Sequence, residues 1–153
     1  MRQDTRGTAL FDVLRLLPAY VSFGVLKHVV PLSRLARWAW SPPAGAGDDT
    51  AVDPERAVRA VTRISRRFAV TDRDCLQRSL VLYRELSRAG ARPTLVMGFA
   101  PGTSGLAGHA WVETEARGPG RSVLSEDVSA YSAAAAFGDG GVVYAEASTP
   151  DDR

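Results

Sequence analysis

The segment that follows Asp74 predicts a helix that is apolar around most of its circumference. Between Cys75 and Gly90 its apolar residues are Leu76, Leu80, Val81, Leu82, Tyr83 and Leu86. A helix that is hydrophobic on nearly all sides is buried in the core of its domain. Gly90 is expected just beyond the last turn, where glycine accepts the left-handed conformation that ends many helices. We therefore expect this helix at the centre of the fold, with Cys75 at its exposed N-terminal end.

Cys75 is the only cysteine of the chain, and it lies in the first turn of this helix. The positive end of the helix dipole and the unpaired backbone N–H groups favour a thiolate at such a position. A single cysteine excludes an internal disulfide and fits a reducing compartment. Because the chain has only two histidines, a zinc site of the Cys/His kind is not expected. We predict neither a metal nor a cofactor.

After Gly90 the sequence pattern changes from helix to short strands. The predicted strands are 94–99, 107–114, 122–125 and 142–144. The first is a continuous apolar run, which is typical of a strand buried on both faces. In the second, alternation puts His109, Trp111 and Glu113 on one face of the sheet. The Ala133–Ala136 run is of low complexity, and we expect it to be irregular or weakly helical.

The N-terminal part of the chain is predicted to be helical. The helices expected from the apolar spacing are 8–17, 19–30 and 32–40. Pro18 is expected to end or kink the first of them. Trp38 and Trp40 either pack this helical part on the main body or form a docking face, since aromatic residues in basic surroundings often anchor interfaces.

A stretch rich in proline and glycine divides the chain. We predict a helical extension over 1–40, a linker over 41–52 and a core domain over 53–153. Asp53 is expected to cap a helix that begins at Pro54 and ends near Phe68. Thr71 or Asp72 is the expected cap of the helix that carries Cys75.

Charge and hydropathy exclude several classes of partner. The net charge is only +2, and the arginine-rich helix before residue 68 lacks any nucleic-acid-binding motif, so we read its arginines as a solvated face. The longest uncharged run near the N-terminus, Leu16 to Leu26, is too short to span a bilayer. No secretory signal is evident. We predict a cytoplasmic protein without a transmembrane segment or a nucleic-acid partner.

A cysteine, a histidine and a carboxylate follow one another in the order of a thiol nucleophile with its base and orienter. These residues are Cys75, His109, and then Glu126 or Asp127. A lone cysteine or a lone strand histidine is more often structural. The combination, with each residue in a favourable setting, favours a catalytic site.

The blocks around these residues resemble a known family. Residues 73–80, 95–98 and 109–113 together resemble the leader-peptidase half of the lasso-peptide B protein, within the transglutaminase-like branch of papain-like enzymes. The resemblance covers about residues 53–131. It implies an α+β fold with a papain-like/transglutaminase-like core, in which a central Cys-bearing helix packs on a small antiparallel sheet and N-terminal helices precede it.

The resemblance also implies an activity. It is that of a stand-alone cysteine peptidase that removes the leader from a ribosomally made lasso-peptide precursor. Cys75 would attack the scissile carbonyl, His109 would transfer the proton, and the Cys75 backbone N–H, with Gln77 as a further candidate, would hold the oxyanion. For the third member, side-chain type favours Asp127 and position favours Glu126.

The expected partners are the leader of the precursor peptide and a separate leader-recognition protein, with the lasso cyclase as a further candidate. Two alternatives stay open at this point. One is a different acyl-transfer enzyme on the same scaffold, because no residue decides between water and an amine as acceptor. The other is a non-catalytic leader-binding module, in which Cys75 would be unreactive.

Overall fold

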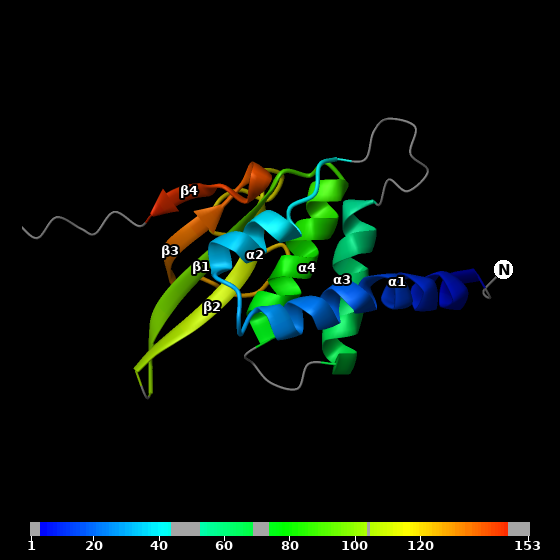
Figure 1. Cartoon of the computed structure of the whole chain (residues 1–153), viewed down its shortest axis with the longest axis horizontal. Coiled ribbons are helices and arrows are strands. Elements are labelled where there is room, and N and C mark those ends of the chain that lie inside the picture. Colours follow the sequence, from blue (N-terminus) through cyan, green and yellow to red (C-terminus); the bar gives the residue numbers. More distant parts are fainter. Residues whose placement is uncertain (1–3, 44–52, 69–73, 104, 147–153) are drawn as a thin grey trace, which may run out of the picture.

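A computed structural model describes residues 4–43, 53–68, 74–103 and 105–146 (Figure 1). Its elements in chain order are α1 (Asp4–Leu26), α2 (Leu32–Ala39), α3 (Pro54–Phe68), α4 (Cys75–Arg88), β1 (Pro93–Gly102), β2 (Gly105–Thr114), β3 (Ser132–Phe137), the 3-10 helix η2 (Asp139–Gly141) and β4 (Val143–Glu146). None of the described helices is long and apolar enough to cross a membrane.

The strands form one antiparallel sheet in the order β2-β1-β3-β4. β1 lies in the interior of the sheet, and Leu95 and Val96 are buried, as predicted for the apolar run 94–99. Phe99, at the end of that run, is 44% exposed, so the burial predicted for the run holds only in part. β2 lies at one edge of the sheet. The predicted α+β class, with a central helix on a small antiparallel sheet and preceding N-terminal helices, is confirmed.

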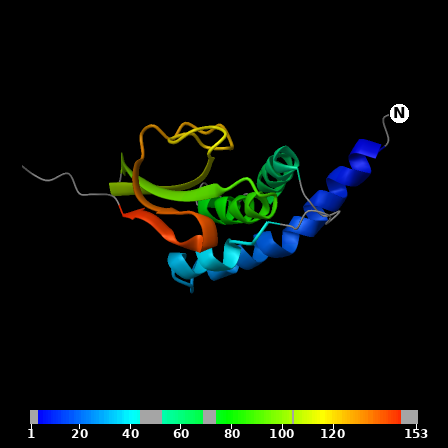
Figure 2. The ribbon, with the colours of Figure 1, turned by 90° about the horizontal axis from the view of Figure 1, so that it is seen from above.

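The helix α4 packs between the sheet and the other helices, as its apolar circumference predicted. Leu80, Val81, Leu82 and Tyr83 are fully buried in the main core. The helix ends at Arg88. Beyond it, Gly90 has a φ of +72°, and Gly90 and the next residue donate backbone hydrogen bonds to the last turn. Figure 2 shows the helices gathered on one side of the sheet, while the segment between β2 and β3 arches over the other side.

The N-terminal helices contribute to the same core as α4. Leu16, Tyr20 and Phe23 of α1 and Leu35 of α2 are buried with the residues of α4 and β1. The two tryptophans of this region differ: Trp40 packs against the core, whereas Trp38 is 53% exposed. Packing on the main body, one of the two roles predicted for the tryptophans, therefore applies to Trp40 but not to Trp38.

The structure differs from the sequence-based prediction at Pro18 and agrees with it at Asp53. Pro18 neither ends nor separates helices, because α1 continues through it from Asp4 to Leu26. Proline leaves the carbonyl four residues earlier without its helical partner, and here both Pro18 and Leu14 are exposed, so water can hydrate that group.

Asp53 caps α3 as predicted, accepting from the backbone N–H groups of Glu55 and Arg56 at 3.2 Å. The predicted caps Thr71 and Asp72 lie outside the described residues.

Two predictions after β2 are wrong. Residues 122–125 form a turn and not a returning strand: Ser125 N–H donates to the Ser122 carbonyl, and Ser125 has a φ of +60°. The Ala133–Ala136 run is part of β3 and not irregular or helical. Its backbone pairs with β1 on one side and with β4 on the other, and this pairing overrides the helix propensity of alanine.

Candidate active site

Cys75 is the first residue of α4, and its thiol is free and partly exposed. Asp74 occupies the position before it. The backbone N–H groups of the first turn lack helical acceptors, so the end of α4 carries a partial positive charge at the cysteine. The structure therefore places this thiol in the setting predicted from the sequence.

Residues of α1 and Lys27, which directly follows it, hold this end of α4. Lys27 Nζ donates to Asp74 Oδ1 at 3.0 Å and to Gln77 Oε1 at 3.3 Å. Gln77 Nε2 donates to the Tyr20 carbonyl at 2.7 Å. Gly24 makes room for this contact, because a Cβ there would lie 2.7 Å from Gln77 Nε2. Gln77 is thus buried against α1, where its amide anchors the cysteine helix.

His109 lies on the edge strand β2, in an aromatic cluster. Its ring stacks on Tyr131, with 4.9 Å between ring centroids, and lies 6.1 Å from the ring of Trp111 on the same strand face. Val96 and Val128 pack with Trp111 in a small core on this side of the sheet. Stacked rings restrict the orientations that the imidazole can adopt.

Glu126 is the carboxylate that reaches His109. Its Oε2 lies 3.5 Å from His109 Nε2 and accepts from the Ser122 hydroxyl at 3.3 Å. Its Oε1 accepts a hydrogen bond from the Arg78 guanidinium. Arg78 thereby fixes one carboxylate oxygen and leaves the other facing the imidazole.

Asp127 has a different environment. Its Oδ1 accepts from the Ser129 backbone N–H at 3.0 Å and from the Ser129 hydroxyl at 2.7 Å. These hydrogen bonds lower the pKa of the exposed Asp127 carboxyl. The side chain therefore stabilises a turn beyond Glu126, while the contact with His109 is made by Glu126.

Two contacts join the cysteine helix to the strand that carries His109. Ser79, one turn after Cys75, donates from Oγ to the Ala110 carbonyl at 2.9 Å. Arg78 of the same turn reaches Glu126, the neighbour of His109. The first two turns of α4 are thus attached to both the histidine strand and the carboxylate loop. These contacts place the helix that begins at Cys75 against the strand of His109 and the loop of Glu126.

Gly98 on β1 is required by the aromatic cluster. A Cβ on Gly98 would lie 2.7 Å from Trp111 Cη2 and 2.9 Å from the Ser132 carbonyl oxygen. Trp111 has little freedom to move, because its Nε1 donates to Glu113 at 2.8 Å and its ring packs in the small core. The indole that flanks His109 therefore depends on a glycine at position 98.

An open hollow of about 600 Å³ adjoins Glu126. Arg117, Arg121, Ser125 and Asp127 are among the residues of the loop after β2 that line it. Among the described residues, no group of three or more His, Cys, Asp or Glu side chains is arranged to hold a metal ion.

Several residues of this site had no role in the sequence-based prediction. Arg78 belongs to the block around Cys75, but nothing in its spacing indicated a contact with Glu126. Tyr131 follows a loop whose path the sequence does not reveal, and Lys27, just after α1, is distant in sequence from Cys75. All three act through contacts between segments far apart in the chain, which periodicity does not detect.

Residues 13–133 match the transglutaminase-like superfamily. This match spans most of the chain and includes Cys75, His109 and both candidate carboxylates. A comparison with curated proteins gave no match, and neither did a comparison with solved structures.

Proposed function

Because this chain belongs to the transglutaminase-like superfamily, we propose that it is a cysteine peptidase that removes the leader from a lasso-peptide precursor. A separate cyclase would then close the macrolactam on the freed core. The observation that carries the proposal is the contact of Glu126 with His109, with Arg78 of the cysteine helix holding the same carboxylate. The resemblance of the blocks around Cys75 and His109 to the lasso-peptide B protein supplies the substrate class.

In the first half of the proposed reaction, the Cys75 thiolate attacks the carbonyl carbon at the leader–core junction. His109 holds the proton taken from the thiol, and the Cys75 backbone N–H donates to the developing oxyanion. The C–N bond then breaks as His109 gives its proton to the leaving amine. The leader remains on Cys75 as a thioester.

In the second half of the proposed reaction, the amine has left and a water molecule takes its place beside the thioester. His109 accepts a proton from water as the oxygen attacks the thioester carbonyl, and the C–S bond breaks to release the leader carboxylate and the Cys75 thiol. Glu126 orients the imidazole and stabilises its charged form. We assign Gln77 a positioning role, because its amide already donates to the Tyr20 carbonyl.

The proposed partners are the precursor peptide and a separate leader-recognition protein, with the cyclase as the next enzyme. Tethering the leader through the recognition protein would raise its effective concentration at Cys75. Cleavage is therefore expected to be much faster with that protein present.

The experiment that tests the proposal is cleavage of a lasso-peptide precursor, run in H₂¹⁸O with its recognition protein. A peptidase gives a free core and a leader carboxylate that carries one ¹⁸O atom. An amine-accepting transglutaminase gives an amide without the label when a primary amine is added. A non-catalytic leader-binding module binds the precursor and leaves it intact.

Gly98→Ala is expected to lower the cleavage rate by roughly 10- to 100-fold, because displacement of Trp111 disturbs the cluster that orients His109. Steady-state kinetics of precursor cleavage measures the effect. Trp111→Phe in the Gly98→Ala background removes the indole atoms that the new Cβ would meet, so the double variant is expected to recover part of the loss. A Gly98→Ala variant with wild-type kinetics would contradict this role of the glycine.

A further inference from the structure

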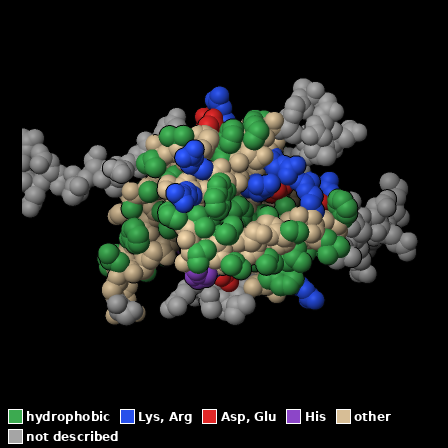
Figure 3. All heavy atoms as spheres, in the orientation of Figure 1, with side chains coloured by type: hydrophobic (Ala, Val, Ile, Leu, Met, Phe, Trp, Pro, Cys, Tyr) green, Lys and Arg blue, Asp and Glu red, His purple; other side chains and the backbone are tan. Residues whose placement is uncertain are grey.

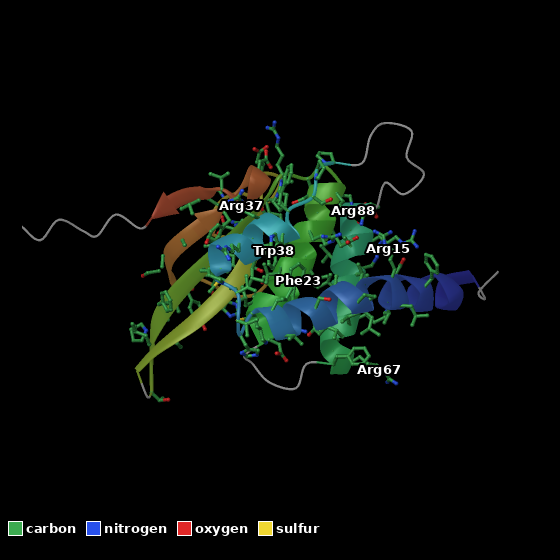
Figure 4. The ribbon with its side chains drawn as sticks, viewed as in Figure 1. Arg15, Phe23, Arg37, Trp38, Arg67 and Arg88 are labelled. Atoms are coloured by element: carbon green, nitrogen blue, oxygen red, sulfur yellow. The ribbon has the colours of Figure 1, made fainter. Side chains whose placement is uncertain are left out.

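A groove of about 420 Å³ lies between α1, α2 and α4, away from the residues assigned to the reaction. Leu16, Phe23 and Leu26 of α1 contribute apolar side chains to it, and α2 adds Trp38. Trp38 is 53% exposed, although tryptophan is usually well covered in a folded domain. Figure 4 shows Phe23, Trp38, Arg15 and Arg88 around this space.

The charged residues of the groove are mainly basic. Arg15, Arg84 and Arg88 line it, and Glu85 is the acidic residue among them. Glu85 is 3% exposed and is paired with Arg15, whose Nη2 lies 2.7 Å from Glu85 Oε2. Arg84 and Arg88 therefore give the groove a net positive charge. In Figure 3, which views this face, Lys and Arg side chains border apolar ones.

An exposed apolar seam on α1 runs beside the groove. Its members are Phe11, Leu14, Pro18, Val21 and Val25, at alternating spacings of three and four residues. Phe11, Leu14, Val21 and Val25 are each more than half exposed, at 65, 57, 55 and 63%. This spacing is that of a helix seam that packs on another helix. Pro18 belongs to both features, so the seam and the groove form one continuous surface.

We infer that this surface binds an amphipathic helix of a separate protein. The apolar face of that helix lies on the exposed seam of α1, and its acidic flank lies over Arg84 and Arg88. The apolar seam supplies the contact area, and Trp38 with the arginines supplies the residue types that dominate interface energetics. A second copy of this chain fits less well, because a symmetric pair would bring the same arginines together. Charge complementarity thus selects an acidic partner.

The inference goes beyond the peptidase proposal and does not depend on it. Cys75→Ala is expected to bind the helix as wild type does, so failure of one proposal leaves the other intact. The probe is a fluorescein-labelled synthetic helix on the order of three heptads long, with leucine at the seam positions and glutamate beside them. A matched peptide carries glutamine in place of glutamate.

Fluorescence polarisation at two salt concentrations gives the affinities. We expect the glutamate helix to bind wild type about tenfold or more tightly than the glutamine helix, and Trp38→Ala and Arg88→Glu each to lose about tenfold. Arg67→Glu is the matched control, because Arg67 is an exposed arginine at the end of α3 (Figure 4). It is expected to bind within about twofold of wild type.

Three results would overturn the inference. One is equal binding of the two peptides. Another is equal loss in Arg88→Glu and Arg67→Glu. The last is binding to phosphatidylglycerol vesicles, or self-association in analytical ultracentrifugation, without binding of the glutamate helix. Thermal unfolding of Trp38→Ala shows whether that variant is folded, and Arg88→Glu provides an independent reading if it is not.

Discussion

Cys75→Ala and His109→Ala are each expected to slow leader cleavage by about 10⁴-fold or more while the protein stays folded. Alanine at position 75 removes the sulfur that would form the thioester. Alanine at position 109 removes the group that would carry the proton to the leaving amine. Both losses act on the chemical step, so single-turnover cleavage of the precursor is the appropriate measurement.

The control for His109→Ala is His28→Ala, because His28 is the other histidine of the chain and is exposed. It is expected to cleave within about twofold of wild type. Circular dichroism and thermal unfolding check that each variant is folded. Near wild-type cleavage by purified, folded Cys75→Ala would contradict the assignment of this protein as a cysteine peptidase.

Glu126→Gln is expected to lower kcat on the order of 10²- to 10⁴-fold, whereas Asp127→Asn is expected to stay within about twofold of wild type. Only Glu126 has an oxygen 3.5 Å from His109 Nε2, while the Asp127 carboxylate accepts from Ser129. The two changes are isosteric and remove one charge each from adjacent positions. Their comparison therefore isolates the contact with the imidazole.

Arg78→Met extends the test to a positioning residue. It removes the guanidinium that holds Glu126 Oε1, so the loss in kcat is expected to lie between those of Glu126→Gln and Asp127→Asn. The pH profile of kcat should change in Glu126→Gln and Arg78→Met, because both alter the stabilisation of the imidazolium. Equal mild losses in Glu126→Gln and Asp127→Asn, with unchanged profiles, would show that neither carboxylate orients His109.

The helix and strand that carry Cys75 and His109 could be predicted because local patterns determine them. The apolar circumference after Cys75 predicts a buried helix, and its position before that run places Cys75 at the N-terminal end. Alternation around His109 predicts the strand and puts Trp111 on the same face, as the ring contacts confirm. Each of these inferences uses neighbouring residues alone.

The carboxylate could not be chosen from the sequence. Side-chain type favours Asp127, and the sequence pattern predicts a strand over 122–125. That segment is a turn with a positive φ at Ser125, so strand alternation does not apply to the residues after it. The Glu126 carboxylate is held by Arg78, which lies 48 residues earlier in the chain, and by Ser122 of the preceding turn.

Tertiary contacts also decide the other differences. The Ala133–Ala136 run is a strand because β1 and β4 pair with it, and α1 passes Pro18 because that residue lies on an exposed face. Trp38 and Trp40 are two residues apart, yet only Trp40 packs against the core. Composition predicts the same role for both tryptophans, whereas their packing in the structure differs.

Covalent labelling of Cys75 tests the central claim most directly. The probe is a leader peptide whose carboxyl terminus at the cleavage site is replaced by a chloromethyl ketone, incubated with the enzyme and the recognition protein. Peptide mass spectrometry is expected to find the leader adduct on Cys75 in wild type, with labelling slowed about 100-fold or more in His109→Ala. Wild-type enzyme that cleaves the precursor but carries no adduct on Cys75 would contradict the account.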